Sequence, residues 1–299
     1  LRSRQQTVDN RQTTHYLTPT IHTTRIRRIA NPLPKSEGKT LVMGILNVTP
    51  DSFYDGGRYL KVKDAVRRGL KMIDEGAGLV DIGGVSTRPG SETIPLEEEL
   101  KRVIPVVKEL ASLTEIPLSV DTYRASVAEK ALEAGAVMVN DISGLSDKDM
   151  ARVAASHGAT LVIMHIKGKP HRYPQNPVYR NIIYEVSSFL ERRVEMALKM
   201  GVKSSNIIID PGLGFGKTAS QSLELLRRLG ELRALGQPIM VGPSRKSFIG
   251  KVLGVDAGDR LPGTLAIIAL AILQGASIIR VHDVKEAVQV ASLCSAFKG

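Results

Sequence analysis

Five short apolar runs in this chain each end in an acidic or amide residue, and segments with helical periodicity separate the runs. The five residues at the run ends are Asn47, Asp81, Asp121, Asn140 and Asp210. Continuous apolar runs are typical of strands that are buried on both faces, as in a parallel sheet covered by helices. Such strands carry polar groups at their carboxyl ends in a parallel α/β barrel, where the strand ends converge on one face. The pattern therefore predicts a fold and also the face that carries the chemistry.

The alternation continues along the chain and gives eight strands and eight helices. The expected strands are 41–46, 79–82, 117–121, 137–140, 159–164, 206–209, 238–242 and 278–281. The expected helices are 63–76, 96–113, 123–135, 147–156, 178–201, 218–235, 261–275 and 284–297. Long polar loops follow strands one, two, five and seven, and loops of this kind on the catalytic face can order over a substrate. Eight strands, each followed by a helix, predict a single-domain α/β fold, the (β/α)8 or TIM barrel, over residues 41–299.

Residues 1–40 stand apart as a basic N-terminal extension. They contain eight Lys or Arg residues against Asp9 and Glu37, which is +6 of the net charge of +11. We expect a tail or a hairpin that closes the bottom of the barrel, although an organellar presequence has a similar composition. The excess charge is not gathered on one helix, and aromatic residues are only 4% of the chain with no Trp. Nucleic acid is therefore not an expected partner.

The single cysteine, Cys294, excludes an intrachain disulfide and a cysteine-based zinc site. We expect it to be a small buried hydrophobe in the last helix. The longest apolar stretch, residues 265–273, is shorter than the roughly 20 residues that span a membrane. These features predict a protein of a reducing compartment, the cytoplasm, with no membrane partner.

The polar residues that end strands three, four and six form the first candidate site. Asp121, Asn140 and Asp210 should converge at the barrel mouth, and two carboxylates with an amide are a poor zinc site. They suit a flat heterocycle with adjacent N–H donors, because a carboxylate can accept two parallel hydrogen bonds. Lys246, just after strand seven, could neutralise a carboxylate and donate to a ring atom. The alternative interpretation is that the three residues are N-caps of the helices that follow them.

A second candidate site binds an anion at the end of strand eight. Arg280 and His282 are two residues apart, so both should point to the same side of the strand, with the Arg guanidinium suited to phosphate. Arg88 and Lys246, on long loops, add positive charge. The alternative is that Arg280 forms a structural ion pair with an interior carboxylate.

Two further features have weaker meaning. The glycine-rich segment 210–218 is not a phosphate-binding loop of nucleotide triphosphatases, because Pro211 occupies the position of the first required glycine. His165, at the end of strand five, is either a hydrogen-bonded core residue or a base.

These segments together resemble the signatures of the dihydropteroate synthase family of pterin-binding barrels. Residues 43–53 with 55–57 resemble the first signature, and residues 81–84 with 86–90 resemble the second. The similarity continues in order through residues 119–122, 140–144, 210–212, 215–217, 244–247 and 280–284. It covers residues 41–298 at the spacing of a barrel.

The resemblance implies a transferase of folate biosynthesis that is inhibited by sulfonamides. It would join 6-hydroxymethyl-7,8-dihydropterin pyrophosphate to p-aminobenzoate and release pyrophosphate. The residues implied to hold the pterin are Asp121, Asn140, Asp210 and Lys246. Those implied to hold the pyrophosphate are Asn47, Arg88, Arg280 and His282, with Asn47 as a ligand of the cofactor Mg²⁺. Those implied to bind p-aminobenzoate are Thr87, Arg88, Pro89, Phe215 and Ser247.

For such a reaction we expect the leaving group to depart ahead of attack. Mg²⁺, Arg280 and His282 would stabilise the departing pyrophosphate, and Asp55 with Phe53 would shield the pterin cation. Lys246 is also expected to be a catalytic residue. A weakly basic arylamine then needs no strong general base. The family also implies a homodimer.

Two departures from the family pattern leave alternatives open. Val85 stands where the second signature usually has Glu, and the fifth loop differs near Lys169 and at Tyr173-Pro174. A diverged paralogue with little synthase activity is one alternative. A methyltetrahydrofolate–corrinoid methyltransferase is another, but that class does not need the segments 86–90 and 244–247, which are both present here.

Overall fold

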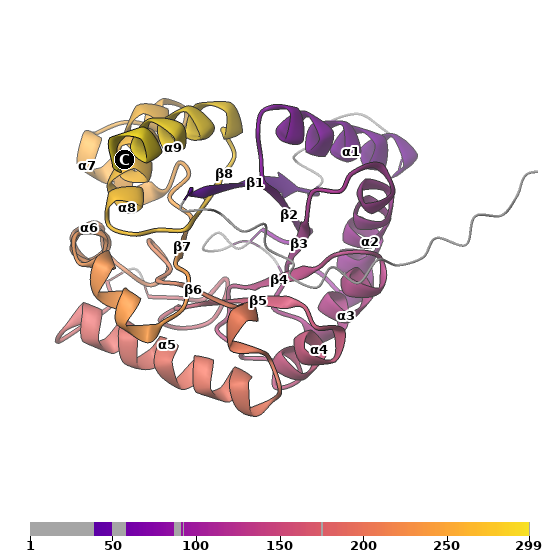
Figure 1. The fold of residues 1–299 in the computed structure, drawn as a ribbon, viewed down its shortest axis with the longest axis horizontal. Coiled ribbons are helices and arrows are strands. Elements are labelled where there is room, and N and C mark those ends of the chain that lie inside the picture. The colour runs from indigo at the N-terminus through magenta and orange to yellow at the C-terminus, as the bar shows by residue number, and fades with distance from the viewer. Residues whose placement is uncertain (1–38, 50–57, 87–90, 92, 175, 299) are drawn as a thin grey trace, which may run out of the picture.

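The computed structural model describes residues 39–49, 58–86, 91, 93–174 and 176–298, and Figure 1 shows a barrel of strands inside a ring of helices. The expected basic extension falls almost entirely on residues 1–38, outside the described residues. Among the described residues, no helix is long and apolar enough to cross a membrane.

Eight parallel strands form the barrel, in the order β6-β5-β4-β3-β2-β1-β8-β7. The strands are β1 (Leu41–Asn47), β2 (Leu79–Gly83), β3 (Leu118–Asp121), β4 (Met138–Asp141), β5 (Thr160–Met164), β6 (Ile207–Asp210), β7 (Met240–Val241) and β8 (Ile278–Val281). A parallel bridge between Ile209 and Ile239 joins β6 to the segment before β7, with Ile209 N donating to Pro238 O at 3.0 Å. The (β/α)8 barrel is thus confirmed.

Helices cover the outside of the barrel. They are α1 (Arg58–Asp74), α2 (Leu96–Leu113), α3 (Ala125–Glu133), α4 (Met150–His157), α5 (Ile182–Lys199), α6 (Ala219–Arg227), α7 (Ser247–Leu253), α8 (Leu261–Leu273) and α9 (Val284–Lys298). Short 3₁₀ helices are η2 (Ser204–Asn206), η3 (Leu229–Leu235) and η4 (Ala257–Arg260).

Four expected elements differ from those in the structure. The helix expected over 218–235 is α6 followed by η3, and the helix expected from 178 begins at Ile182. The loop expected over 242–260 contains α7 and η4. The strand expected over 238–242 has only two residues in the ladder, because Pro238 has no backbone donor.

Side chains of the strands alternate between two apolar layers. The interior of the barrel is closed by a cluster of Met43, Leu79, Met138, Val162, Ile208, Met240 and Ile278. The other strand residues pack against the helices in one large outer cluster. Cys294 is buried in that outer cluster, as expected. The interior cluster forms a floor, and residues two positions further along each strand lie directly above it.

Candidate active site

A polar layer lies above the apolar floor because strand side chains repeat with a period of two. Leu79, Met138, Ile208 and Ile278 belong to the floor. Two residues further along the same strands are Asp81, Asn140, Asp210 and Arg280. The same alternation that closes the core therefore delivers three acidic or amide side chains and one guanidinium to the barrel mouth.

Arg280 is held by two carboxylates at the centre of this layer. Its Nε donates to Asp81 Oδ2 at 2.6 Å, and its Nη2 donates to Asp121 Oδ2 at 2.5 Å. Asn140 Nδ2 donates to the same Asp81 oxygen at 2.9 Å. The interior ion pair left open by the sequence is thus present, and it joins strands β2, β3, β4 and β8. Breaking one partner of such a buried pair costs several kcal/mol, about 3–5, because an uncompensated charge remains.

Asp81 is a site residue to which the sequence argument gave no role. The signal was available, because a carboxylate inside an otherwise apolar strand is buried and must find a partner. Asp81 is fully buried, and β1 and β3 flank it on both sides.

Burial controls the ionisation of the two predicted carboxylates. Burial raises the pKa of Asp121 to about 7. The positive charge of Arg280 opposes this rise, and the negative charge of Asp81 adds to it. Burial also raises the pKa of Asp210, which Lys246 and the hydrogen bond from Gly212 N oppose. That bond, to Asp210 Oδ1, is 2.7 Å long. Gly212 has a φ of +66°, and a Cβ there would lie 2.0 Å from His165 O, so this turn requires glycine.

The alternative that Asp121, Asn140 and Asp210 are N-caps was wrong. The residues at the caps of α3, α4 and α6 are Arg124, Asp149 and Thr218. Thr218 forms a full capping box with Gln221. The three polar strand residues therefore do not serve the helix ends, and their hydrogen bonds lie at the mouth of the barrel.

Two buried acceptors of the polar layer have no hydrogen-bond partner among the described residues. They are Asp81 Oδ1 and Asn140 Oδ1. Native proteins seldom leave such atoms unpaired, because an unpaired buried polar group costs about 1–3 kcal/mol. A flat ligand with N–H groups is the kind of molecule that would satisfy them.

Lys246 lies against the same layer, at the N-cap of α7. Its Nζ donates to Leu213 O and lies 4.2 Å from the centroid of the Phe215 ring. Burial lowers the pKa of Lys246 to about 8, although the charge of Asp210 opposes the change. The next residue, Ser247, is exposed at the first position of α7.

A second buried lysine, Lys217, organises the loop after β6, and the sequence argument gave it no role. Its Nζ donates to Gly212 O at 2.9 Å and to Phe215 O at 3.0 Å, and it lies 2.8 Å from His165 Nδ1. Burial and the Lys217 ammonium lower the pKa of His165 to about 2. His165, whose ring also meets the Phe189 ring edge to face, is therefore the hydrogen-bonded core residue and not a base.

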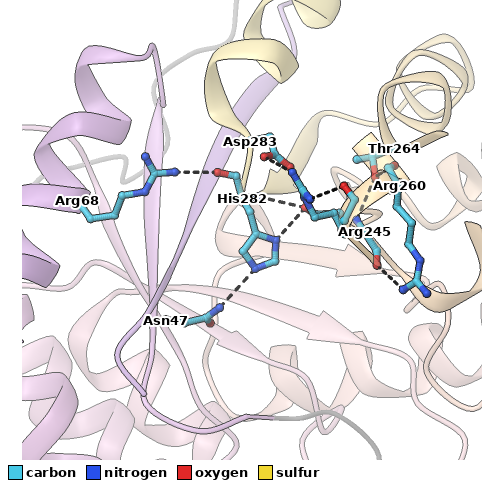
Figure 2. A network of polar contacts seen from close by, with 9 residues as sticks. Asn47, Arg68, Arg245, Arg260, Thr264, His282 and Asp283 are labelled. Atoms are coloured by element: carbon cyan, nitrogen blue, oxygen red, sulfur yellow. Dashed lines mark hydrogen bonds and ion pairs between the residues drawn. The ribbon is translucent and has the colours of Figure 1, made fainter. Parts of the chain in front are cut away.

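The predicted anion residues Asn47 and His282 lie side by side (Figure 2). Asn47 Nδ2 is 3.4 Å from His282 Nε2, and Ser244 Oγ is 2.8 Å from His282 Nδ1. Arg68 of α1 donates to the backbone O of His282 at 3.1 Å. Arg280 points instead to the two carboxylates, so the expected joint aim of Arg280 and His282 at one anion is not what these contacts show. A cavity of about 520 Å³ opens beside Asn47 and His282.

The remaining side of Figure 2 shows how the segment before α7 is fixed. Arg245 has a φ of +50° and makes a two-pronged ion pair with Asp283, at 2.9 Å for each contact. Its backbone N donates to Thr264 at 3.0 Å, and its O accepts from Arg260 at 3.2 Å. Ser244 and Lys246, the neighbours of Arg245 in sequence, are thereby held in place.

Known proteins are similar to this chain in sequence and in fold. Residues 43–282 match the protein family described as pterin binding enzyme. The dihydropteroate synthase of Synechocystis sp. is 48% identical over 260 residues, which cover 86% of this chain and 90% of the relative. The chain belongs to the dihydropteroate synthase family.

Solved structures of the dihydropteroate synthase family have the same fold. The Clostridium difficile enzyme, solved with pteroic acid, is 47% identical with a TM-score of 0.81, and the match covers 87% of this chain and 97% of that one. The Xanthomonas albilineans enzyme, solved with 4-aminobenzoic acid, is 42% identical with a TM-score of 0.82, and the match covers 87% and 94%. Five residues to which the resemblance gave roles, Phe53, Asp55, Thr87, Arg88 and Pro89, lie outside the described residues.

Proposed function

We propose that the polar layer holds the pterin of 6-hydroxymethyl-7,8-dihydropterin pyrophosphate, which the protein joins to p-aminobenzoate to give 7,8-dihydropteroate. The two unpartnered acceptors, Asp81 Oδ1 and Asn140 Oδ1, carry this proposal, because a pterin presents adjacent N–H donors at one edge. Asp121 and Asp210 supply carboxylates beside them, and the Lys246 ammonium donates to a ring atom. The relative solved in the presence of pteroic acid supports a pterin as the kind of ligand that this chain binds.

The pyrophosphate lies, in this proposal, towards Asn47, His282 and Arg280. Arg280 donates through Nε and Nη2 to the two carboxylates. The hydrogens on its other terminal nitrogen, Nη1, can donate to an anion. Arg88 adds charge from the loop after β2. Nearby cationic side chains of α1 line the cavity beside His282, which favours a negatively charged group there.

The residues present fit Mg²⁺ bound mainly through the substrate. Among the described residues no group of three His, Cys, Asp or Glu side chains could hold a metal ion. Mg²⁺ commonly keeps few protein ligands and takes its remaining oxygens from phosphates and water, and the amide oxygen of Asn47 is a suitable ligand. The ion would supply charge neutralisation to the pyrophosphate.

The side chains of this chain then act on the two halves of the reaction. Arg280 and His282 stabilise the charge that develops on pyrophosphate as its bond to the pterin methylene breaks, while Lys246 holds the pterin ring. Asp55 and Phe53 shield the resulting cation. The arylamine attacks that carbon and loses a proton to solvent, so no paired base is required.

The p-aminobenzoate site is proposed to lie beside Lys246. Phe215 offers an aromatic face beneath the Lys246 ammonium, and Ser247 is exposed next to it. Thr87, Arg88 and Pro89 complete the site from the loop after β2. The relative solved with 4-aminobenzoic acid supports a site for this substrate, and sulfonamides, which resemble it, should compete.

We further propose a cytoplasmic homodimer. The single cysteine is buried, so the chain gains nothing from an oxidising compartment. Helices α7, α8 and α9 lie together in Figure 1 and carry large apolar side chains at the surface.

The assignment of the pterin site is tested with Asp210→Asn, which keeps shape and removes the charge. The affinity for pteroic acid, measured by calorimetric titration, and the rate of pyrophosphate release should both fall about 10- to 100-fold. This factor corresponds to the loss of one charged hydrogen bond. Asp141→Asn is the matched control, because Asp141 is also buried at a strand end, but among the described residues its side chain bonds only to its own loop, at Ser143 and Leu145. The control should lower the melting temperature and leave the affinity of the folded protein unchanged.

Two results would contradict the proposal. If Asp210→Asn binds pteroic acid with the affinity of the parent, the pterin does not bind at the polar layer. Pterin binding without turnover in the parent would indicate the diverged paralogue, and Val85→Glu would then be tested for restored activity.

A further inference from the structure

Ser244 lies beside His282 because strands β7 and β8 run side by side to the barrel mouth. Val241 of β7 is the ladder partner of Ile279 of β8. Ser244 and His282 each follow these partners by three residues, so two parallel chains bring them to the same level. Both residues are half-buried. The sequence argument gave Ser244 no role, and the proposed function gives it no contact with a substrate.

The Ser244 hydroxyl makes two contacts with His282. Ser244 Oγ accepts from the backbone N of His282 at 3.2 Å and lies 2.8 Å from the ring nitrogen Nδ1. A hydroxyl has one hydrogen, and the acceptor that the described contacts offer to it is Nδ1. Ser244 therefore donates to Nδ1, which places the ring hydrogen on Nε2. The 3.4 Å contact between Asn47 Nδ2 and Nε2 is long for a hydrogen bond and does not decide the tautomer.

Contacts that do not involve the Ser244 hydroxyl fix the backbone on both sides of this pair. Arg68 donates to the backbone O of His282 at 3.1 Å (Figure 2). Arg245, the residue after Ser244, is held by its two-pronged ion pair with Asp283. An imidazole can still rotate about its last side-chain bond when its backbone is fixed. The Ser244 hydroxyl thus acts on the orientation of the ring more than on the path of the chain.

The His282 ring lines a cavity whose charge suits an anion. The cavity has a volume of about 520 Å³. The other charged side chains of its lining among the described residues, all from α1, are Arg67, Arg68, Lys71 and Asp64. Three cations against one carboxylate favour a negatively charged ligand. An Nε2–H can donate to a phosphate oxygen, whereas an Nε2 without a hydrogen would repel it. The tautomer that Ser244 sets therefore decides whether His282 attracts or repels such a ligand.

We propose that Ser244 is a positioning residue for the pyrophosphate leaving group, which acts by orienting His282 with its Nε2–H towards the anion. This inference rests on the proposed function, which gives His282 to pyrophosphate. It adds a residue that acts on one part of one substrate through another side chain. Ligands that carry pyrophosphate should therefore respond to changes at Ser244, and ligands without it should not.

The test uses pyrophosphate with Mg²⁺ and pteroic acid, which carries no phosphate, as two separate ligands in calorimetric titration. Ser244→Ala removes the hydroxyl and keeps the backbone. We expect its affinity for pyrophosphate to fall roughly three- to tenfold, the factor supplied by one neutral hydrogen bond. Its affinity for pteroic acid should stay that of the parent. Ser244→Thr keeps a hydroxyl and should recover most of the loss.

Kinetics and a matched control separate positioning from a merely structural role. In Ser244→Ala, kcat/KM for the pterin substrate should fall by a similar factor, while KM for p-aminobenzoate stays the same. Ser156→Ala is the control, because Ser156 Oγ lies 3.2 Å from His157 Nδ1 at the end of α4, on the face opposite the barrel mouth. It should behave as the parent in every measurement. Nitrogen chemical shifts of His282 should show a hydrogen on Nε2 in the parent.

The outcomes are distinguishable from failure of the proposed function. A parent that binds pyrophosphate but makes no dihydropteroate contradicts the proposed function and leaves the role of Ser244 measurable by titration. A parent that binds no pyrophosphate overturns both. Unchanged affinity for pyrophosphate in Ser244→Ala overturns the role of Ser244. An equal fall in affinity for pteroic acid, a loss in Ser244→Thr as large as in Ser244→Ala, or a His282 ring hydrogen only on Nδ1 overturns it as well.

Discussion

At the scale of single residues, the Lys246 ammonium is a partly buried charge that we propose binds the pterin substrate. It lies between the Phe215 ring, Leu213 O and the field of Asp210. Because its pKa is lowered to about 8, the ammonium is lost at a far lower pH than in a free lysine. We expect kcat/KM for the pterin substrate to fall as pH rises through about 8.

The lowered pKa of Lys246 makes kcat/KM fall as pH rises, but it makes the free energy of unfolding rise. Between pH 8 and the ordinary lysine pKa the unfolded chain binds more protons at this position than the folded chain does, so Lys246 makes the free energy of unfolding rise with pH. A pH profile of kcat/KM together with urea unfolding at each pH checks both signs. Lys246→Met should lower kcat/KM about 10- to 100-fold and remove the fall in kcat/KM near pH 8. If the fall near pH 8 persists in this variant, it is due to the titration of another group.

At the scale of elements, the segment before α7 depends on the ion pair between Arg245 and Asp283. That pair connects the β7–α7 loop to the corner between β8 and α9, and Arg245 stands between Ser244 and Lys246. The Arg245 hydrogen bond holds the pKa of Asp283 below its usual range, so the pair is intact at neutral pH and weakens as pH falls. We expect Asp283→Asn to lower kcat/KM about tenfold through misplaced Ser244 and Lys246.

The matched control for that prediction is Glu231→Gln. Glu231 accepts the same two-pronged contact from Arg228, at 2.7 and 2.9 Å, but on the surface in η3. Surface pairs contribute little, so this variant should keep the activity of the parent. Steady-state kinetics of both variants give the change in kcat/KM. Equal losses of kcat/KM in Asp283→Asn and Glu231→Gln would contradict a specific role of the Arg245–Asp283 pair in holding Ser244 and Lys246.

The barrel elements were largely predictable because their signals are local. Apolar runs fixed the strands to within a few residues, and Gly76, Gly135 and Gly275 follow helix ends with positive φ. Helix α7 was missed because its seven residues, which include Gly250, carry little periodicity, and because its end depends on Gly254 in the left-handed conformation. Tertiary contacts with α8 and η4 stabilise it instead.

The polar contacts of the site were less predictable, because they depend on residues far apart in sequence. The sequence placed Asp121, Asn140 and Asp210 at the mouth, but the partners of Arg280 follow from the barrel register. Ser244 gave no sequence signal of its contact with His282, since it lies in an irregular loop. Residue types and strand ends are local information, whereas the partner of a side chain is set by closure of the whole barrel.

At the scale of the whole molecule, one side of the helical ring is unusually apolar. Helix α8 has no charged residue over its 13 positions, yet Leu270 and Leu273 are 50% and 47% exposed. Leu293 and Phe297 of α9 are 73% and 79% exposed, and α9 packs beside α8. A helix without a polar face is normally buried, so this surface is the one we expect to bury in the proposed homodimer.

This expectation is tested by placing charge on the apolar surface. Leu273→Lys combined with Leu293→Lys should convert a dimer to a monomer in light scattering after gel filtration, because unpaired charges in an apolar interface cost several kcal/mol, roughly 3–5. The matched control is Leu113→Lys at the end of α2, where a 52% exposed leucine lies on another side of the barrel. The control should remain dimeric. A double variant that is still dimeric would place the interface elsewhere, and a monomeric parent would leave this apolar surface for another partner. In the dimer, α7 would lie near the contact, so the variant that separates the subunits should also lower kcat/KM through Lys246 at the start of that helix.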